Sequence, residues 1–467
     1  MMPIRCVLLV LCAAGMLLAQ PRRLPPLKVS ENGRFLVTAD GRPFFWLADT
    51  AWELFHRLNR EEALHYLDTR ARQGYNVVQA VALAELDGIT DPNPYGMLPL
   101  QDRDPARPAV TPGADPKKKG EYDYWDHVDF IVDAANARGI YVAMLPTWGR
   151  WVKDTPIFTP ENAEIYGKWL GERYKTKGII WVLGGDRPAD GLEAIWRSMA
   201  RGIALGVLGR EDYAAVLMTY HPQGGAKSSA WFHHDAWLSF NMQQNGHGVP
   251  GTRQPFLHIA QDYARTPVKP VLDGEPLYED HPLAFRAKEL GYSFDAHVRQ
   301  YAYWDVFAGA FGHTYGNHAV WQMHAAGRKP INGPLMEWRQ AIERPGAGQM
   351  RHLKALIESR PFLSRVPDQA LLREALSGAD SIAATRGDGY VFVYSAQGRT
   401  IQLQPLPFAR ARAWWFNPRS GAAYEAGEHD STRPLEFRCP SEGFGSDWVL
   451  VLDDAARRFP PPGTPLK

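Results

Sequence analysis

Short hydrophobic runs alternate with amphipathic stretches over residues 44–314. Eight of these runs have the length and composition of buried β-strands: 44–49, 76–83, 141–147, 179–184, 214–220, 237–242, 270–273 and 309–314. Stretches with helical periodicity lie between them, among others at 60–73, 124–138, 162–175 and 295–307. Eight β–α repeats in about 300 residues predict a (β/α)8 TIM barrel, with its active site at the strand ends. A doubly wound open sheet is the alternative.

The pattern changes after residue 345. One helical stretch at 350–359 precedes six short strand-like runs, separated by turn sequences such as Gly387-Asp388-Gly389. The runs are 381–384, 390–395, 400–404, 411–416, 434–437 and 448–452. Strands of this kind predict a small antiparallel β-sandwich. We therefore expect a barrel over 24–345, a linker helix and sandwich over 349–455, and a proline-rich tail over 456–467.

The N-terminus has the pattern of a secretory signal. Arg5 precedes an apolar run at 6–18, which contains small residues and is too short to span a membrane as a helix. We expect a cleaved signal peptide over 1–19, an exported protein that is periplasmic or extracellular, and no integral membrane segment after cleavage. Lipid attachment at Cys12 is the alternative. Cleavage leaves Cys439 as the last cysteine, so no internal disulfide is expected.

Charge and motif content make several classes of function unfavourable. The chain has 52 Lys and Arg against 51 Asp and Glu, a formal net charge of +1, which offers no basic surface for nucleic acid. The 15 histidines form no H-E-x-x-H motif, and the adjacent His233 and His234 would point to opposite sides of an extended segment. We therefore expect no metal and no cofactor. Serine-nucleophile and phosphate-loop motifs are also missing from the sequence, which makes a secreted peptidase a distant alternative.

Carboxylic acids follow two of the predicted strands. The fourth run ends in Gly184-Gly185-Asp186, and the seventh is followed by Gly274-Glu275-Pro276. Hydrolysis of a glycosidic bond needs two carboxyl groups flanking that bond, and Asp186 and Glu275 are the candidates. A helix cap is the structural alternative for Asp186, although Asp190 suits that role better. A surface ion pair is the structural alternative for Glu275, and Glu279 is the rival carboxyl.

Further polar and aromatic residues near the strand ends are expected to bind sugar. They are Asp49, Trp52, Gln79, Trp148, His221, Asn241, Gln243, Asp273, Tyr278, His313, Tyr315 and Asn317. The alternative is that the polar members are buried groups with partners of their own, and Asp49 and Asp273 are expected to fix loops. The 16 Trp and 19 Tyr suit a carbohydrate surface, although a large core uses such residues too. The segment 85–121 is expected to be a lid or substrate wall, with a disordered insertion as the alternative.

Several of these motifs together resemble one known family. They include FWLADTAW at 45–52, RARQGYNVVQ at 70–79, IWVLGGD at 180–186, GEPLYE at 274–279 and GHTYGN at 312–317. The sequence resembles the apiosidase-like family, which includes glycoside hydrolase family 140, over nearly the whole predicted barrel. The C-terminal part resembles the small β domain of that family, which is named after collagen binding in a collagenase.

The resemblance implies an endo-acting glycosidase that cleaves apiose linkages in pectic side chains of the plant cell wall. It also implies that Asp186 and Glu275 are the catalytic pair. By analogy with other sugar-cleaving barrels, we expect Asp186 to be the general acid and Glu275 the nucleophile of a retaining mechanism. Because a nearby cation would lower the pKa of the acid, Arg187 is expected to point away from Asp186. A non-catalytic carbohydrate-binding barrel is the alternative function.

Overall fold

The computed structural model describes residues 23–251 and 255–466. Eight parallel strands form the ring predicted from the sequence: β4 (Trp46–Thr50), β5 (Val77–Val81), β6 (Tyr141–Leu145), β7 (Ile179–Gly184), β8 (Met218–His221), β9 (Asn241–Gln243), β10 (Val271–Asp273) and β11 (Gly312–Tyr315). Six of them pair in the order β11-β4-β5-β6-β7-β8, and β9 pairs with β10. Backbone bonds from Ser239 to Met218 (2.8 Å) and from Phe311 to Val271 (3.1 Å) join the two sets. The predicted TIM barrel is confirmed, and the open sheet is not formed.

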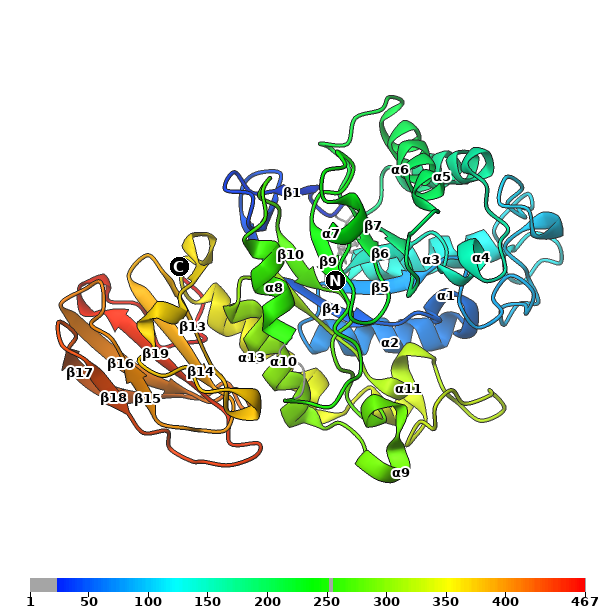
Figure 1. Cartoon of the computed structure of the whole chain (residues 1–467). Helices are drawn as coiled ribbons and strands as arrows, with labels where there is room; N and C mark the ends of the chain where they lie inside the picture. Colours follow the sequence, from blue (N-terminus) through cyan, green and yellow to red (C-terminus); the bar gives the residue numbers. More distant parts are fainter. Residues whose placement is uncertain (1–22, 252–254, 467) are drawn as a thin grey trace, which may run out of the picture.

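Helices surround the barrel, and short ones lie in its connections (Figure 1). The longer helices are α2 (Arg60–Arg72), α3 (Tyr124–Ala137), α5 (Pro160–Tyr174), α6 (Glu193–Leu208), α8 (Pro255–Tyr263), α10 (Asp295–Phe307) and α13 (Pro345–Glu358). The short ones are α1 (Leu54–Arg57), α4 (Arg150–Lys153), α7 (Ser229–Phe232), α9 (Ala287–Leu290), α11 (His318–Trp321) and α12 (Trp338–Ala341). Capping boxes start several helices: the Asn59 side chain accepts from the Glu62 amide (2.9 Å) before α2, and Asp123 and Thr159 do the same for α3 and α5.

The chain enters the fold at the N-terminal end of the barrel. An antiparallel sheet of β1 (Leu27–Val29), β2 (Leu36–Thr38) and β3 (Pro43–Phe44) precedes the first barrel strand. The Tyr141 hydroxyl at the start of β6 donates to the Pro25 carbonyl, which ties this segment to the barrel. The expected signal peptide, 1–19, lies outside the described residues. No helix within 23–251 or 255–466 is long and apolar enough to cross a membrane.

The long connection after β5 is folded against the barrel. The Trp125 indole of α3 donates to the Pro99 carbonyl (2.8 Å), and the Tyr95 hydroxyl accepts from the Arg60 amide (3.0 Å). At the start of the connection, the Asp91 carbonyl lies 3.0 Å from a ring nitrogen of the buried His56. These bonds tie the segment to α1, α2 and α3, so it forms a fixed wall beside the strand ends.

The C-terminal region is the expected antiparallel sandwich. Its larger sheet has the order β12-β13-β14-β19-β16-β17, and β15 pairs with β18 in a smaller one. The strands are β12 (Val366–Pro367), β13 (Ile382–Gly387), β14 (Tyr390–Ser395), β15 (Ile401–Leu403), β16 (Arg410–Phe416), β17 (Ala423–Asp430), β18 (Leu435–Phe437) and β19 (Trp448–Asp454). Sequence analysis did not identify β17, because this edge strand is mostly exposed and lacks apolar alternation.

The larger sheet is apolar on both faces, and one face packs on the barrel. Tyr394 stacks on Tyr303 of α10 with ring centroids 4.8 Å apart, and Phe392 stacks on Phe307 at 6.1 Å. Adjacent side chains of β16 separate the two faces: Trp414 joins the barrel core, whereas Trp415 joins the core between the two sheets. In Figure 1, α10 and α13 lie between the barrel and the sandwich. The expected linker helix corresponds to α13, whose buried side chains belong to the barrel core.

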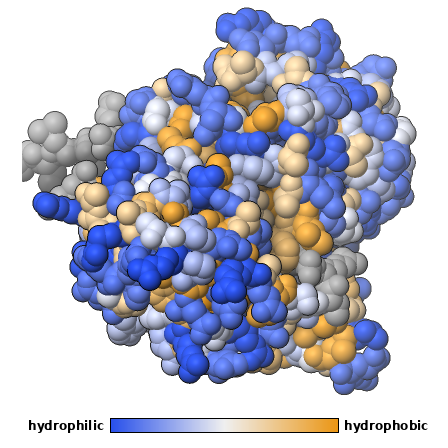
Figure 2. Space-filling model, turned by 60° about the vertical axis from the view of Figure 1, so that its left-hand side comes forward, coloured by the Kyte–Doolittle hydropathy of each residue, from blue (hydrophilic) through white to orange (hydrophobic). Residues whose placement is uncertain are grey.

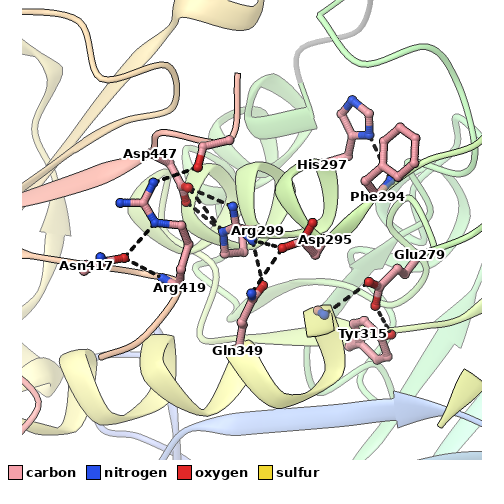
Figure 3. A network of polar contacts seen from close by, with 12 residues as sticks. Glu279, Phe294, Asp295, His297, Arg299, Tyr315, Gln349, Asn417, Arg419 and Asp447 are labelled. Atoms are coloured by element: carbon pink, nitrogen blue, oxygen red, sulfur yellow. Dashed lines mark hydrogen bonds and ion pairs between the residues drawn. The ribbon is translucent and has the colours of Figure 1, made fainter. Parts of the chain in front are cut away.

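Buried ion pairs reinforce this junction. Arg299 of α10 contacts Asp447 in the loop before β19 (2.9 Å) and Asp295 on its own helix (2.6 Å), and it donates to Gln349 of α13 (2.6 Å) (Figure 3). Arg360, just after α13, pairs with Asp453 of β19 at 2.7 Å. The barrel and the sandwich are therefore joined by both apolar and charged contacts. The outer surface on the sandwich side, in contrast, is mainly hydrophilic, with hydrophobic residues showing in separate patches (Figure 2).

Candidate active site

A cavity of about 530 Å³ opens at the C-terminal ends of the barrel strands. Asp186 and Glu275 both line it, together with Glu85, which follows β5. Aromatic side chains form much of the remaining wall: Trp52, Trp148, Tyr278, Phe285 and Trp321. A concave site with a few polar groups among aromatic walls is the usual form of a ligand site in this fold.

A strained turn presents Asp186 to the cavity. Gly184, Gly185 and Asp186 all have positive φ, at 93°, 121° and 55°. A Cβ atom on Gly184 would lie 2.3 Å from the His221 carbonyl oxygen, and one on Gly185 would lie 2.8 Å from the Trp148 ring. Both positions therefore require glycine, and Asp186 itself adopts a conformation that residues with a side chain rarely adopt.

The pKa of Asp186 is raised from its ordinary value. Burial is the largest cause, and the negative charge of Glu275 adds to it, whereas His221 and Arg187 act in the opposite direction. The expectation that Arg187 points away is wrong, because its Nη1 lies 3.3 Å from Asp186 Oδ2. The same guanidinium contacts Asp154 at 2.7 Å, and its charge is shared between the two carboxylates. Asp186 thus keeps a raised pKa beside a cation.

Glu275 is buried and held in its ionised form. His221 Nε2 lies 3.2 Å from one carboxylate oxygen, and His247 Nε2 lies 3.0 Å from the other. Burial alone would raise the pKa of Glu275, but the two histidines outweigh it and hold the pKa at about 2. Asp186 and Glu275 therefore differ in the way that an acid and a nucleophile must differ.

Asp273 fixes the loop that carries Glu275. Its carboxyl group accepts from the Asn245 side chain (2.6 Å) and from the Glu275 backbone amide (3.1 Å). Burial raises the pKa of Asp273 to about 7. Asp273 is not part of the cavity lining, so the structure places it beneath the site rather than against a ligand.

The rival carboxyl, Glu279, lies in the barrel wall. It accepts from the Tyr315 hydroxyl (2.6 Å) and from the Gly346 amide (3.2 Å) in the first turn of α13 (Figure 3). Burial raises its pKa to about 7, and no surface of the cavity is formed by it. Glu279 therefore caps the N-terminus of α13 and leaves Glu275 as the glutamate of the GEPLYE segment that faces the cavity.

The expected sugar ligands divide into two groups. Trp52, Trp148 and Tyr278 line the cavity, and His221 lies directly behind Glu275 with its ring edge-on to Trp52. The others lie below the lining, and most of them form a hydrogen bond with another part of the protein. These pairs are Asp49 with Arg70, Gln79 with the Gly274 carbonyl, Asn241 with His233, Asp273 with Asn245, Tyr315 with Glu279, and Asn317 with Asp280. Gln243 and His313 are also buried, and their side-chain nitrogens and oxygens find no hydrogen-bond partner in the part of the chain described here.

Several lining residues were not among the sequence-based candidates. His247 and its neighbours Gln244 and Asn245 follow β9, and Glu85 follows β5 after three small or apolar residues. Glu85 shows the same signal that identified Asp186, because it is an acid that follows a strand end. It was instead assigned to the loop 85–121. His247 could not be identified in this way, because its contact with Glu275 joins two different connections. Within the described ranges, no three His, Cys, Asp or Glu side chains are placed to hold a metal ion.

Comparisons with known families agree with this architecture. A family model described as "Apiosidase-like, catalytic domain" matches residues 30–364, and one described as "Putative collagen-binding domain of a collagenase" matches residues 366–453. No curated protein matches the sequence.

Solved structures extend the similarity to both domains. A glycoside hydrolase family 5 protein from Bacteroides vulgatus is 36% identical with a TM-score of 0.84, covering 93% of this chain and 95% of its own. A structure named "Glycoside hydrolase" is also 36% identical with a TM-score of 0.83, covering 92% of this chain and 97% of its own. A putative glycoside hydrolase from Bacteroides vulgatus is 15% identical with a TM-score of 0.64 over 92% of this chain and 82% of its own, and shares the fold. The family match over 30–364 means that this chain belongs to the apiosidase-like family.

Proposed function

We propose that the protein is an exported glycoside hydrolase that cleaves apiose-containing linkages in pectic polysaccharide of the plant cell wall, with retention of configuration. Family membership and the glycoside hydrolase fold support a carbohydrate hydrolase. The observation that carries the two-carboxylate mechanism is the contrast between an ionised Glu275 and an Asp186 whose pKa is raised, both at one cavity, whereas retention is proposed by analogy with other sugar-cleaving barrels.

In the proposed first step, Glu275 attacks the anomeric carbon while Asp186 donates its proton to the leaving oxygen. The attack forms a covalent glycosyl–enzyme ester and breaks the glycosidic bond. Asp186, now ionised, then takes a proton from water, and that water displaces Glu275 from the sugar. The histidines at Glu275 suit the nucleophile, because they stabilise the carboxylate before the attack and as the leaving group.

The cavity walls support binding of a sugar ring. Trp52 and Trp148 lie with ring centroids 5.1 Å apart on one side, and Phe285 is exposed at the mouth on another. Aromatic faces bury the C–H surfaces of sugars while leaving the hydroxyl groups to polar neighbours. The strand-end polar residues Gln244 and Asn245 supply such neighbours.

Hydrolysis of apiose-containing pectic oligosaccharides tests this function directly. The purified protein should release a product whose initial anomeric configuration matches the substrate, as measured by proton NMR during the first turnovers. Glu275→Gln should abolish release, whereas the exposed Glu289→Gln on α9 should not change it. An inverted product would overturn the retaining mechanism. Binding of the oligosaccharide without any cleavage would instead establish the non-catalytic alternative.

The proposed export has its own test. The full-length chain expressed with its N-terminus intact should be recovered outside the cytoplasm with residues 1–19 removed. N-terminal sequencing of the recovered protein would show Gln20 as the first residue. Recovery of the uncleaved chain from the cytoplasm would contradict export.

A further inference from the structure

We propose that Glu85 is a substrate-binding residue that holds an oxygen of an uncharged sugar unit by donating the proton of its carboxyl group. The inference rests on the proposed function for the nature of the ligand. It goes beyond the Asp186 and Glu275 pair by assigning a role to the third carboxyl group of the cavity.

The backbone around Glu85 is held on three sides. The Leu86 amide donates to Glu53 Oε1 (3.0 Å), Arg150 Nη1 donates to the Glu85 carbonyl (3.2 Å), and the Trp151 indole donates to the Ala84 carbonyl (3.0 Å). Glu53 is itself fully buried and held by His56. The backbone of Glu85 is therefore held in place, and precise placement of a ligand atom requires such a fixed backbone.

The Glu85 carboxyl group, in contrast, has no protein partner. Within 23–251 and 255–466, no hydrogen bond or ion pair reaches its oxygens. Neither nearby arginine forms an ion pair with it, since Arg150 is paired with Asp87 (3.1 Å) and Arg187 with Asp154 and Asp186. A carboxyl group that lines a cavity without a partner on the protein side is available to a ligand.

The charges around Glu85 keep it neutral. Burial is the largest effect, the carboxylates of Asp186, Glu53 and Glu275 add to it, and Arg187 opposes it, so that the pKa of Glu85 is raised to about 8. At Glu85 the effect of these carboxylates outweighs that of Arg187, which is the smallest of the effects named here. At neutral pH, Glu85 is thus a hydrogen-bond donor as well as an acceptor, unlike an ordinary glutamate.

This arrangement restricts the chemistry of the sugar at Glu85. A hydroxyl group can accept the proton of a neutral carboxyl group and donate to its carbonyl oxygen. A uronate carboxylate at the same place would face the same carboxylates that raise the pKa of Glu85, and would be repelled. The sugar unit that contacts Glu85 is therefore neutral, even when the rest of the glycan is acidic.

The protonation state is tested without any substrate. In the full-length protein labelled with ¹³C at glutamate carboxyl groups, one resonance should disappear in Glu85→Gln, and in the wild type it should titrate near pH 8. Titration of that resonance near pH 4 to 5 would overturn the proposal. This measurement stands whether or not the protein hydrolyses a glycan.

Kinetics on an apiose-containing pectic oligosaccharide test the contact itself. Glu85→Met, which cannot donate, should raise KM about 10-fold, and Glu85→Gln, which keeps a donor, should raise it only about 3-fold. The wild-type KM should rise above pH 8 as Glu85 loses its proton, and that rise should be missing in Glu85→Gln. The exposed Glu61→Gln in α2 is the matched control. A Glu85→Met variant with the wild-type KM would overturn the proposal, whereas a protein that cleaves none of these glycans would overturn the proposed function and leave the titration result in force.

Discussion

The cavity and the barrel–sandwich junction both bury charged groups, but they balance them differently. At the junction, Arg299 is matched by Asp447 and Asp295, and Arg360 by Asp453. In the cavity, Asp186 contacts the Arg187 guanidinium, which is shared with Asp154, Glu275 contacts two histidines, and Glu85 has no ion-pair partner among the described residues. Removal of one member of a buried ion pair destabilises the fold, whereas like charges close together shift one another's pKa.

The matched ion pairs of the junction stabilise the fold, whereas the carboxyl groups of the cavity are the groups proposed to act on the substrate. Removing one member of a buried, matched pair leaves the other charge without compensation and destabilises the fold. Removing a carboxyl group that is kept partly neutral by its neighbours relieves repulsion instead. Mutations at the junction should therefore lower the stability of the fold with little effect on activity, whereas mutations at the cavity should lower activity with little effect on stability.

The largest effect is expected from Glu275→Ala. Loss of the nucleophile should lower kcat/KM on the pectic oligosaccharide by at least about 10⁴-fold, as for removal of other central catalytic groups. Initial rates with high enzyme concentration measure it, and Glu289→Gln serves as the surface control. Residual activity within a factor of 10 of the wild type would show that another group attacks the sugar.

The second largest loss of activity is expected from Asp186→Ala. General acid catalysis is worth about 10²–10⁴-fold, so kcat should fall by that amount on a glycan and by less on an aryl glycoside with a good leaving group. Added azide should restore turnover of the aryl glycoside by attacking the glycosyl–enzyme. Equal losses on both substrates, without an azide response, would assign the acid to another residue.

Asp186→Asn should not destabilise the fold at pH 7, because asparagine tolerates the left-handed backbone at this position and removes only the charge. The pKa of Asp186 is higher in the folded state than in the unfolded chain, so above its unfolded pKa the group favours unfolding. Urea unfolding should therefore give a midpoint equal to or above that of the wild type. A lower midpoint in Asp186→Asn, but not in the exposed Asp190→Asn, would mean that the ionised Asp186 is stabilising.

Arg299→Met tests the opposite region. It should reduce the free energy of unfolding by about 3–5 kcal/mol, because Asp447 and Asp295 lose their shared cation in a buried place. The kcat/KM of the folded enzyme should change little. Arg412→Met, which breaks an exposed pair with Glu425, should cost less than about 1 kcal/mol. Equal losses for the two variants would contradict the importance of the junction pair.

The smallest effect is expected from His247→Ala, as a change in pH dependence. Removing a partner of the ionised Glu275 raises its pKa from about 2, so the acidic limb of kcat/KM should move toward higher pH by about one unit. The loss should be about 2-fold near pH 3, should approach 10-fold only below pH 2, and should be negligible at pH 6. His429→Ala in the sandwich is the control. An unchanged acidic limb would show that His221 alone sets the ionisation of Glu275.

The barrel could be predicted because its signals are local. Apolar strand runs and capping residues such as Asn59 and Asp123 act over a few positions, and both motif carboxyls, Asp186 and Glu275, lie where a strand ends. Three strands were predicted to begin too early, since residues 214–217, 237–240 and 309–311 form turns and loops before β8, β9 and β11. Turns of this kind depend on the neighbouring strand rather than on hydrophobicity.

The parts that could not be predicted depend on contacts between distant segments. The orientation of Arg187 depends on Asp154, which lies 33 residues away, and on the left-handed turn at Asp186. Glu279 could be separated from Glu275 only when Gly346 and Tyr315 were seen to bind it. The edge strand β17 has no pattern of its own, because its partner β16 supplies its position.

The stacked rings between α10 and the sandwich also bear on whether the barrel could exist without its partner domain. A barrel released by cleavage after residue 364 would expose Tyr303 and Phe307 as part of a broad apolar face, and it would leave Arg299 without Asp447. Such a fragment would aggregate rather than act alone. The sandwich therefore also covers an apolar face of the barrel, and we expect a truncation between the two domains to cost the barrel its solubility as well as its neighbour.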